Sequence, residues 1–397
     1  MSATVLTLNA GSSSLKFGLF ALSAEPTALA EGAIEAIGAQ PRLRVAGPDG
    51  APLAEAALEA AAAETPGAAA ETALARMRAL FPEREIAVVG HRVVHGGPVY
   101  AEPVVVTDAV LEELARYSAF APLHQPHNLA GVRAARAAHP GALQIACFDT
   151  SFHRNHPWVN DVFALPRAYY DKGVRRYGFH GLSYDYVSGA LAAYAPHLHA
   201  GRVVIAHLGN GASMCGLLGG RSIGSTMGFS ALDGLPMGTR CGQLDPGVVL
   251  YLMEQEGLGP AEVADLLYKK SGLLGLSGLS NDMRTLEQAG TPEAEQAIAY
   301  FVFRIRRELG ALAAVLGGLD AVVFCGGIGE RSSRIRAQIC EGTQWLGLEL
   351  DRAANAEGRR VISTELSRVR ALVIPTNEEL VIARAARRFL DAGAAAP

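Results

Sequence analysis

Two segments of the chain have the residue types and spacing of phosphate-binding turns. Residues 5–17 (VLTLNAGSSSLKF) and 203–216 (VVIAHLGNGASMCG) each combine an apolar strand, a turn of Asn, Gly, Ala and Ser, and a second apolar strand. Such turns supply positive φ angles, clustered backbone N–H groups and hydroxyl donors, which together form concave anion sites. Two of them predict two related halves of the protein that bind a polyphosphate.

Three glycine-rich segments carry the cationic side chains that phosphoryl transfer needs. Arg92, His180 and Arg240 occur in HRVVHGG, YGFHG and MGTRCG, which we expect to be loops. A guanidinium offers a planar pair of donors to carboxylate or phosphate oxygens, and glycine lets a ligand approach the backbone. Each residue alone is better explained as a surface ion pair or a structural histidine. Together with the two turns, they favour phosphoryl-transfer chemistry.

Two carboxylates occupy positions suited to a metal or a catalytic role. Asp149 follows the apolar strand 144–148, where a ligand-binding carboxylate is expected, although a helix N-cap explains it equally well. The segment 376–379 (TNEE) has the pattern of a capping box with Thr376 as N-cap and Glu379 reaching back to it. Glu378 is then left to face a site, which makes it the better metal ligand of the pair.

Two common nucleotide-binding signatures are absent or incomplete. The chain contains no G-x-x-x-x-G-K-[ST] sequence and therefore no P-loop. The segment 327–332 (GIGERS) follows an apolar strand, but Ser332 replaces the third glycine of a dinucleotide fingerprint. Two interpretations stay open for it: a strand-to-helix glycine turn, or a turn whose backbone lies flat against an adenosine.

The order of elements indicates an α/β protein of two domains. We expect a hairpin over 1–22, two helical pieces over 51–80, and helices near 108–118, 127–139 and 377–391, with strands at 86–90, 144–148 and 371–375. A buried helix from Leu309 should end at Gly317 and lead into a strand. The chain of 397 residues is too long to fold around one hydrophobic core, so we expect two domains and place their boundary near residue 150.

Composition excludes several classes of partner. The net charge of −4 and pI near 6.3 argue against nucleic acid or anionic membrane as the main partner. Five scattered cysteines without a CxxC pair suggest reduced thiols in the cytoplasm. The N-terminus lacks a signal-peptide pattern, and Asp320 interrupts the longest apolar stretch, so we expect a soluble cytoplasmic protein without a membrane span.

Ten motifs in order make the chain similar to the acetate and propionate kinases, a family of the actin–sugar kinase–Hsp70 superfamily. They are NAGSSSLK from Asn9, GHRVVHGG from Gly90, APLHQP from Ala121, FDTSFH from Phe148, RYGFHG from Arg176, HLGNGAS from His207, MGTRCGQLDP from Met237, SNDMR from Ser280, GGIGE from Gly326 and PTNEE from Pro375. The resemblance implies Mg²⁺-dependent, reversible, direct in-line phosphoryl transfer from ATP to acetate, giving acetyl phosphate and ADP.

The family's architecture implies a duplicated actin/ribonuclease H-like βββαβαβα core in two domains with a cleft between them. The N-terminal domain would comprise residues 1–150 joined by the C-terminal helix at about 377–397. The C-terminal domain, residues 151–376, would bind the nucleotide and form the interface of a homodimer.

Carried over residue by residue, the resemblance also implies roles. Asn9 and Glu378 would hold Mg²⁺ or Mn²⁺, and Asp149, His180 and Arg240 would be catalytic. Arg92, Val94, Leu123, His124 and Phe179 would bind the acyl substrate. ATP or ADP would contact Ser12, Ser14, Lys16, His207, Leu208, Gly209, Asn210, Gly211, Asp282, Met283, Arg284, Gly327, Ile328, Gly329, Glu330 and Arg331.

The chain departs from the family pattern at several positions. Tyr184 stands where His is common, Arg331 where Asn is common, and Ala231 where the acyl pocket usually has proline. Ala231 leaves the acyl-chain preference open, with a propionate or broad short-chain acyl kinase as the alternative. An actin- or Hsp70-like ATPase that serves as a binding module is the alternative from a different class. It would not need two arginines matched to a carboxylate.

Overall fold

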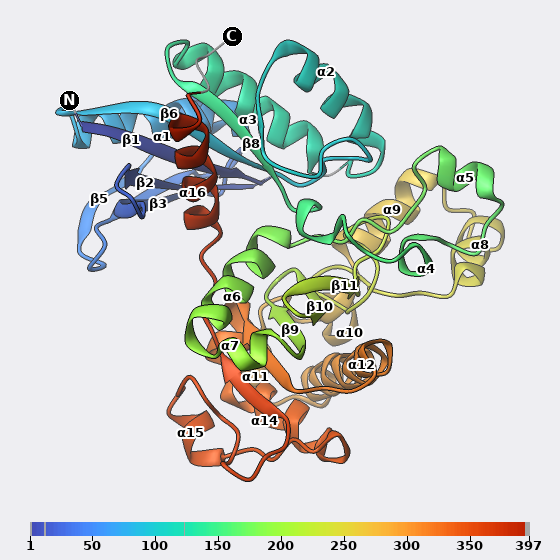
Figure 1. Ribbon diagram of the computed structural model, residues 1–397. Helices are drawn as coiled ribbons and strands as arrows, with labels where there is room; N and C mark the ends of the chain where they lie inside the picture. Colours follow the sequence, from blue (N-terminus) through green and yellow to red (C-terminus); the bar gives the residue numbers. More distant parts are fainter. Residues whose placement is uncertain (1, 12, 123, 394–397) are drawn as a thin grey trace. The chain divides into compact units, whose positions relative to one another are not determined.

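The computed structural model describes residues 2–11, 13–122 and 124–393, which form two compact units (Figure 1). Unit 1 is drawn from residues 1–151 and 377–397, and unit 2 from residues 152–376. Each unit is built around one mixed β-sheet with helices on both of its faces. The described residues contain no helix with the length and apolar character needed to cross a membrane.

The sheet of unit 1 has the strand order β5-β4-β3-β2-β1-β6-β8-β7. Its strands are β1 (Ser2–Ala10), β2 (Ser14–Ala21), β3 (Thr27–Glu35), β4 (Arg42–Ala46), β5 (Pro52–Ala57), β6 (Arg84–Val93), β7 (Val104–Val105) and β8 (Leu143–Phe148). Strands β1 to β5 are successive antiparallel neighbours, whereas β6 runs parallel to β1 and β8 parallel to β6. The carboxyl ends of β1, β6 and β8 therefore meet at one edge of the sheet.

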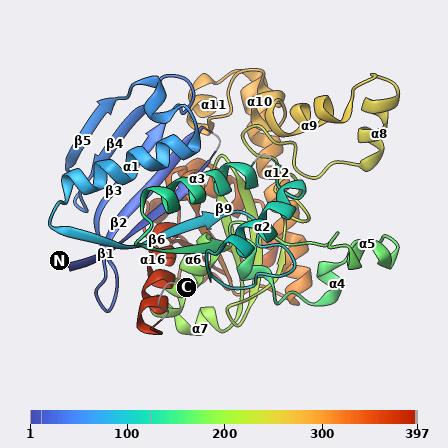
Figure 2. The same ribbon diagram turned by 90° about the horizontal axis from the view of Figure 1, so that it is seen from above.

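Three helices cover the two faces of this sheet (Figure 2). Helices α1 (Pro66–Leu80) and α3 (Gln125–Ala138) lie over one face, with α2 (Asp108–Arg116) packed against α3. Helix α16 (Glu378–Asp391) packs against β1 and β6, where Gly90 leaves room for the side chain of Ile382. A buried cluster that includes Leu6, Leu8 and Leu74 fills the space between the sheet and α1.

Unit 2 repeats the central five strands of unit 1. Its sheet has the order β11-β10-β9-β12-β13, from β9 (Arg202–Leu208), β10 (Ala212–Leu218), β11 (Arg221–Ser225), β12 (Ala321–Cys325) and β13 (Arg370–Val373). The first three strands are antiparallel and the last two are parallel to β9, as in β3-β2-β1-β6-β8. Helices α6 (Gly181–Tyr194) and α12 (Pro292–Leu316) each pack against this sheet. This repetition is the duplicated α/β core expected from the sequence.

Shorter helices complete unit 2. They are α4 (Trp158–Asp161), α5 (Arg167–Asp171), α7 (Pro196–His199), α8 (Pro246–Glu254), α9 (Pro260–Lys269), α10 (Gly272–Ser277), α11 (Met283–Ala289), α13 (Gly326–Arg331), α14 (Ser333–Glu341) and α15 (Arg352–Ala356). Helices α11 and α13 matter most for function, because their first turns line the cavity described below.

Several elements agree with the sequence prediction. The hairpin of β1 and β2, the strand before Asp149, and helices α2 and α3 all form at or near the expected residues. Helix α12 ends with Gly317 in the left-handed region at φ 71°, and strand β12 follows it. The glycine has no Cβ to strain this conformation, so it ends the helix at little cost.

Two predictions about local structure were wrong. Only the second piece of 51–80 is an α-helix, because residues 52–57 form β5 and pair with β4 at the sheet. Pairing with an existing strand overrides the weak helical preference of alanine and glutamate. Arg92 does not lie in a loop: it belongs to β6, which extends to Val93, further than the apolar pattern of 86–90 suggested.

The cap of the C-terminal helix also differs from the prediction. Asn377, not Thr376, is the N-cap residue of α16, and its side-chain oxygen accepts a hydrogen bond from Leu380 N at 2.8 Å. The backbone N–H of Thr376 donates instead to Glu330. Glu378 is consequently the first residue of the helix, so the capping box does not form.

Candidate active site

The carboxyl ends of β1, β6 and β8 bring four predicted site residues of unit 1 together. Arg92 donates two hydrogen bonds to Asp149, from Nε to Oδ1 at 2.9 Å and from Nη2 to Oδ2 at 2.6 Å. Its Nη1 donates to Asn9 Oδ1 at 2.9 Å, and Glu378 Oε2 lies 3.7 Å from Arg92 Nε. The Asp149 carboxylate thus pairs with a guanidinium rather than capping a helix.

The charges in this cluster do not balance. Burial raises the pKa of Glu378 to about 7, and Asp149 and Glu379 add to this effect while Arg92 and Lys16 oppose it. Burial also disfavours the charge on Arg92, but Asp149 and Glu378 outweigh it and hold the Arg92 pKa above its usual value. One arginine therefore faces two buried carboxylates, and the second carboxylate is incompletely compensated.

This donor set fits a Mg²⁺ ion. Magnesium binds oxygen ligands, usually one or two carboxylates with several water molecules and substrate phosphates. Asp149 and Glu378 supply two carboxylates, Asn9 supplies an amide oxygen, and a bound cation would relieve the unbalanced charge on Glu378. No group of three or more His, Cys, Asp or Glu side chains suited to a metal occurs in the described part of the chain, so the substrate or water would have to complete the coordination.

Other predicted residues of unit 1 lie on the elements that flank this cluster. Lys16 on β2 is the register partner of Asn9, and the carbonyl of Ser14 accepts a hydrogen bond from Gly11 N at 2.8 Å. Val94 is buried just beyond β6, and His124 is the N-cap residue of α3. The predicted residues Ser12 and Leu123 lie outside the described residues.

Two buried amides of α3, which the sequence analysis did not select, hold this region in place. Asn128 Oδ1 accepts from Val94 N at 2.9 Å, and its Nδ2 donates to the carbonyl of Ala10. Gln125 accepts from the backbone N–H of His95 and donates to the carbonyl of the same residue. Gln125 occurs in the APLHQP motif, and its spacing of three from Asn128 on one helix face was an available signal.

The phosphate turn of unit 2 lies between two stacked histidines and an arginine. His180 and His207 stack with ring centroids 4.3 Å apart. A Cβ atom placed on Gly211 would lie 3.3 Å from His180 Nε2 and 4.0 Å from Arg240 Nη1. Glycine at residue 211 leaves this space open, so a ligand that approaches the turn would meet the side chains of both His180 and Arg240.

His180 has an unusual backbone conformation. It is the N-cap residue of α6 and adopts φ 58°, one of two positive φ angles among the described non-glycine residues. Such a conformation costs about 1 kcal/mol or more and persists where surrounding contacts impose it. Here His153 Nε2 donates to the carbonyl of Phe179, the preceding residue, at 3.0 Å. Phe179 itself is buried.

Arg240 is hydrogen-bonded to the backbone of Ala231, a position that the sequence analysis singled out. Arg240 Nη1 donates to the carbonyl of Ala231 at 3.1 Å and lies 3.6 Å from the sulfur of Met237. Both Arg240 and Ala231 are half-buried. The guanidinium therefore has a defined position beside Ala231, so this position is well placed to influence what Arg240 binds.

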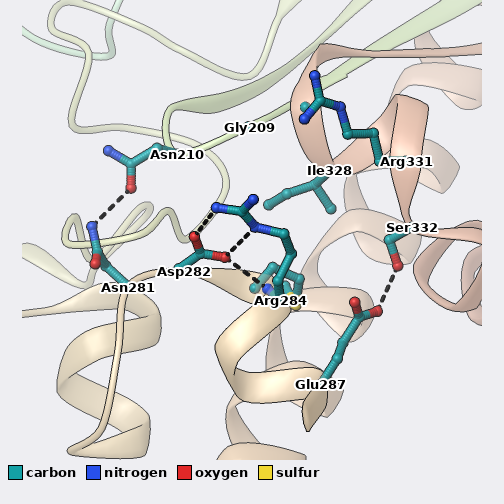
Figure 3. A pocket seen from close by; sticks show the side chains of 11 residues that line it. Gly209, Asn210, Asn281, Asp282, Arg284, Glu287, Ile328, Arg331 and Ser332 are labelled. Carbon is teal, nitrogen blue, oxygen red and sulfur yellow. Dashed lines mark hydrogen bonds and ion pairs between the residues drawn. The ribbon is translucent and has the colours of Figure 1, made fainter. Parts of the chain in front are cut away.

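A cavity of about 490 Å³ opens beside the same turn (Figure 3). Eight of its eleven lining residues were predicted nucleotide contacts: Gly209, Asn210, Asp282, Met283, Arg284, Gly327, Ile328 and Arg331. The other three, Asn281, Glu287 and Ser332, were not predicted. Its volume falls in the ordinary range for small-molecule sites. Met283 and Ile328 supply apolar surface to the cavity, and the first turn of α13 forms part of its wall.

Polar contacts fix the walls of this cavity. Figure 3 shows Arg284 paired with Asp282, Ser332 donating to Glu287, and Asn281 directed at Asn210. Arg331 has no such dashed contact in this view and lies on α13 near Ile328. Asn281 lies within the SNDMR motif but was not selected from it, whereas Glu287 lies three residues beyond the motif and joins the lining because α11 is helical.

Three other predicted nucleotide contacts have side chains outside this lining. Leu208 is completely buried, and Gly329 is buried against the backbone of β9 and β12. The Glu330 carboxylate accepts hydrogen bonds from the backbone N–H groups of Gly326 at 2.8 Å and Thr376 at 3.2 Å. Glu330 therefore holds the start of α13 against the irregular segment that follows β13.

The repeated sheet, the paired glycine turns and the nucleotide-sized cavity define a phosphotransferase of the actin-like ATPase fold. The Acetokinase family model matches residues 4–384. The acetate kinase of Methylocella silvestris is 57% identical, with both chains covered completely. The crystal structure of Porphyromonas gingivalis acetate kinase has a TM-score of 0.86 at 37% identity, covering 98% of this chain and 100% of that one.

The chain belongs to the acetokinase family, whose acetate kinases transfer a phosphoryl group between ATP and acetate. A propionate kinase from Francisella tularensis is also similar, with a TM-score of 0.89 at 34% identity over 97% of this chain and 99% of that one. The higher identity to acetate kinases means that the propionate alternative is not favoured. Acetate, ATP and acetyl phosphate are therefore the substrates, and the binding-module alternative is not supported.

Proposed function

We propose that the chain catalyses Mg²⁺-dependent, direct in-line transfer from ATP to the carboxylate of acetate, with the residue roles given below. The observation that carries this proposal is the Arg92 fork, which pairs with Asp149 and donates to Asn9 at the carboxyl ends of three strands. A planar pair of donors beside acidic side chains suits a site that must hold a carboxylate substrate and a divalent cation.

In unit 1, Asn9, Asp149 and Glu378 would hold the metal ion. Mn²⁺ would fit the same ligands as Mg²⁺. When bound, Mg²⁺ supplies positive charge next to the phosphoryl oxygens. Arg92 would bind the carboxylate of acetate. In doing so, acetate would replace part of the pairing that Arg92 now makes with Asp149. The residues that we assign to the acyl group are Val94, Leu123 and His124 of the N-terminal part of the chain, and Phe179 and Ala231 of unit 2.

In unit 2, adenosine would occupy the cavity of about 490 Å³, and the turn at 209–211 would contact the phosphates. His207 would contact the same phosphates. His180 and Arg240 would donate to the oxygens of the phosphoryl group in flight, where charge accumulates in the transition state. In support, both side chains lie next to Gly211 of that turn.

No general base is required for this reaction. The nucleophile is a carboxylate whose pKa, like that of a glutamate, is about 4.3–5, so it is ionised near neutral pH. Asp149 would therefore organise the metal and Arg92 instead of removing a proton. Its two hydrogen bonds to Arg92 support this role, because they occupy both carboxylate oxygens.

We further propose that the protein is a cytoplasmic homodimer. Each subunit would consist of two actin-like domains, one of residues 1–150 with about 377–397 and the other of residues 151–376. The family resemblance and the repeated strand order support this organisation. Light scattering of the purified protein tests the dimer directly, since a monomeric mass of 41.6 kDa would contradict it.

Trapping of the product tests the central proposal. With ATP, Mg²⁺ and acetate, hydroxylamine should convert acetyl phosphate to acetohydroxamate at the rate at which ADP appears. Removing the metal with EDTA should abolish the product, and adding back Mg²⁺ or Mn²⁺ should restore it. The variant Arg92→Ala should lose activity, whereas Arg116→Ala, which removes an exposed arginine of the same unit, should not. ATP turnover independent of acetate would instead favour an ATPase module.

A further inference from the structure

A short chain of buried hydroxyl groups ends at the catalytic histidine of unit 2. Ser213 Oγ on β10 lies 2.8 Å from His180 Nδ1, and the Tyr184 hydroxyl on α6 is also hydrogen-bonded to Ser213 Oγ. Both Tyr184 and Ser213 are completely buried. Tyr184 occupies the position at which the sequence departs from the common histidine of the family pattern.

The direction of these hydrogen bonds follows from counting protons. Burial holds the pKa of Tyr184 well above its usual value, so its hydroxyl keeps its proton. Among the residues described, Ser213 is the only hydrogen-bond partner of that hydroxyl, so a buried donor would be wasted unless Tyr184 donates to Ser213. Within the described residues, the Ser213 hydroxyl is hydrogen-bonded to Tyr184 and His180 alone, and it has one proton of its own, so it donates to His180 Nδ1.

This direction determines the tautomer of His180. A neutral imidazole has one donor and one acceptor nitrogen, and Nδ1 is the acceptor here. Nε2 must then carry the proton, and Nε2 is the atom that lies against Gly211 in the phosphate turn.

We propose that Tyr184 is a positioning residue that acts through Ser213 to fix His180 as the Nε2–H tautomer, so that neutral His180 donates to a phosphoryl oxygen. The inference rests on the role proposed for His180 and adds how the chain holds that residue ready. The opposite tautomer would direct a lone pair at the anionic phosphoryl group and would repel it. Outer-shell partners that fix the tautomer of a metal-bound histidine contribute about 10–100-fold to metal affinity or activity, and we expect the lower end of this range here.

Other titratable groups also face His180, and the test must separate them from the relay. His207 on β9 stacks on its ring and is hydrogen-bonded through Nδ1 to Ser183. Arg240 faces the same turn. On the far side, the Tyr184 ring packs against His153 and lies near Cys215. The ring contacts and the His207–Ser183 hydrogen bond do not involve the Tyr184 hydroxyl.

The experiment compares Tyr184→Phe with the wild type over a range of pH. At pH 7.5–8, we expect kcat of the variant to be about 10-fold lower. Without the Tyr184 hydroxyl, Ser213 can accept a hydrogen bond from Nδ1–H, so His180 is no longer held in one tautomer. The loss should shrink as the pH falls, since a doubly protonated His180 carries an Nε2–H whatever Ser213 does. Tyr177→Phe is the matched control, because it removes another buried tyrosine hydroxyl, bonded to the Gly173 carbonyl at 2.8 Å.

Nitrogen-15 spectra of histidine-labelled protein give a readout independent of activity, with His180→Gln assigning the signal. The wild type should show a protonated Nε2 and an unprotonated Nδ1, and Tyr184→Phe should lose this pattern. A protonated Nδ1 in the wild type would overturn the inference, as would a loss of kcat that is equal at every pH. If His180→Gln keeps full activity while the spectra are as expected, the proposed role of His180 fails, and the assigned tautomer has no catalytic use.

Discussion

The unbalanced charge at Glu378 leads to a prediction about stability that does not depend on catalysis. In the metal-free protein, the pKa of Glu378 is raised from 4.5 to about 7, chiefly by burial. The folded protein therefore binds a proton at this site more tightly than the unfolded chain does. The resulting stabilisation is complete below pH 4.5 and is lost as the pH rises to about 7.

The size of the effect follows from the same values. The difference between 4.5 and about 7, at about 1.4 kcal/mol per pH unit, corresponds to about 3 kcal/mol above neutral pH. The Glu378 side chain is only 16% exposed, so solvent screening reduces this figure little. Glu378→Gln cannot ionise and should gain this amount over the wild type at pH 8.5. In a unit of this size, 3 kcal/mol corresponds to about 6–12 °C in Tm.

Thermal unfolding with EDTA at pH 5.5, 6.5, 7.5 and 8.5 measures the gap between Glu378→Gln and the wild type. The gap should widen with pH, and excess Mg²⁺ should close it by stabilising the ionised wild-type carboxylate, more at pH 8.5 than at pH 5.5. Glu64→Gln is the control, because it removes an exposed carboxylate of the same unit. A gap that stays constant from pH 5.5 to 8.5, or Mg²⁺ stabilisation equal at both extremes, would refute the reasoning.

Three further predictions concern the reaction itself. Arg92→Lys and Arg240→Lys should each lower kcat/KM by about 10²-fold, because a point charge cannot replace the planar fork, and full activity in both variants would contradict the proposed roles. Because we assign Ala231 to the acyl group, propionate should be phosphorylated with kcat/KM within about 10³-fold of acetate, and Ala231→Pro should widen the difference; rates with acetate, propionate and butyrate measure both effects. Asp149→Asn should lower kcat and the apparent affinity for Mg²⁺ together, without removing a pKa from the acidic limb of the pH profile; loss of that limb with unchanged Mg²⁺ affinity would indicate a general base.

Much of the fold was readable in the sequence because its signals are local. The two apolar–glycine–apolar segments became the hairpins β1–β2 and β9–β10, and Gly317 ended α12 as expected. Strand β5 was missed, because an alanine-rich edge strand carries no local signal and forms by pairing with β4. The N-cap of α16 was misassigned by one residue, since both Thr376 and Asn377 carry an oxygen that can cap a helix.

The candidate site divides in the same way. The sequence by itself determined which residue types were present: glycine turns for phosphate, arginine forks for carboxylates, and acidic residues after strands or at a helix start. It could not determine how these groups pair, because Asn9, Arg92, Asp149 and Glu378 are far apart in the chain. They meet only when β1, β6 and β8 align in the sheet and α16 packs against these strands. The raised pKa of Glu378 and the Tyr184–Ser213–His180 relay are likewise products of burial and distance. The preference of a segment for helix, strand or turn depends on neighbouring residues. The charge balance of a site and the direction of its hydrogen bonds depend instead on which distant groups tertiary packing places together in a poorly hydrated environment.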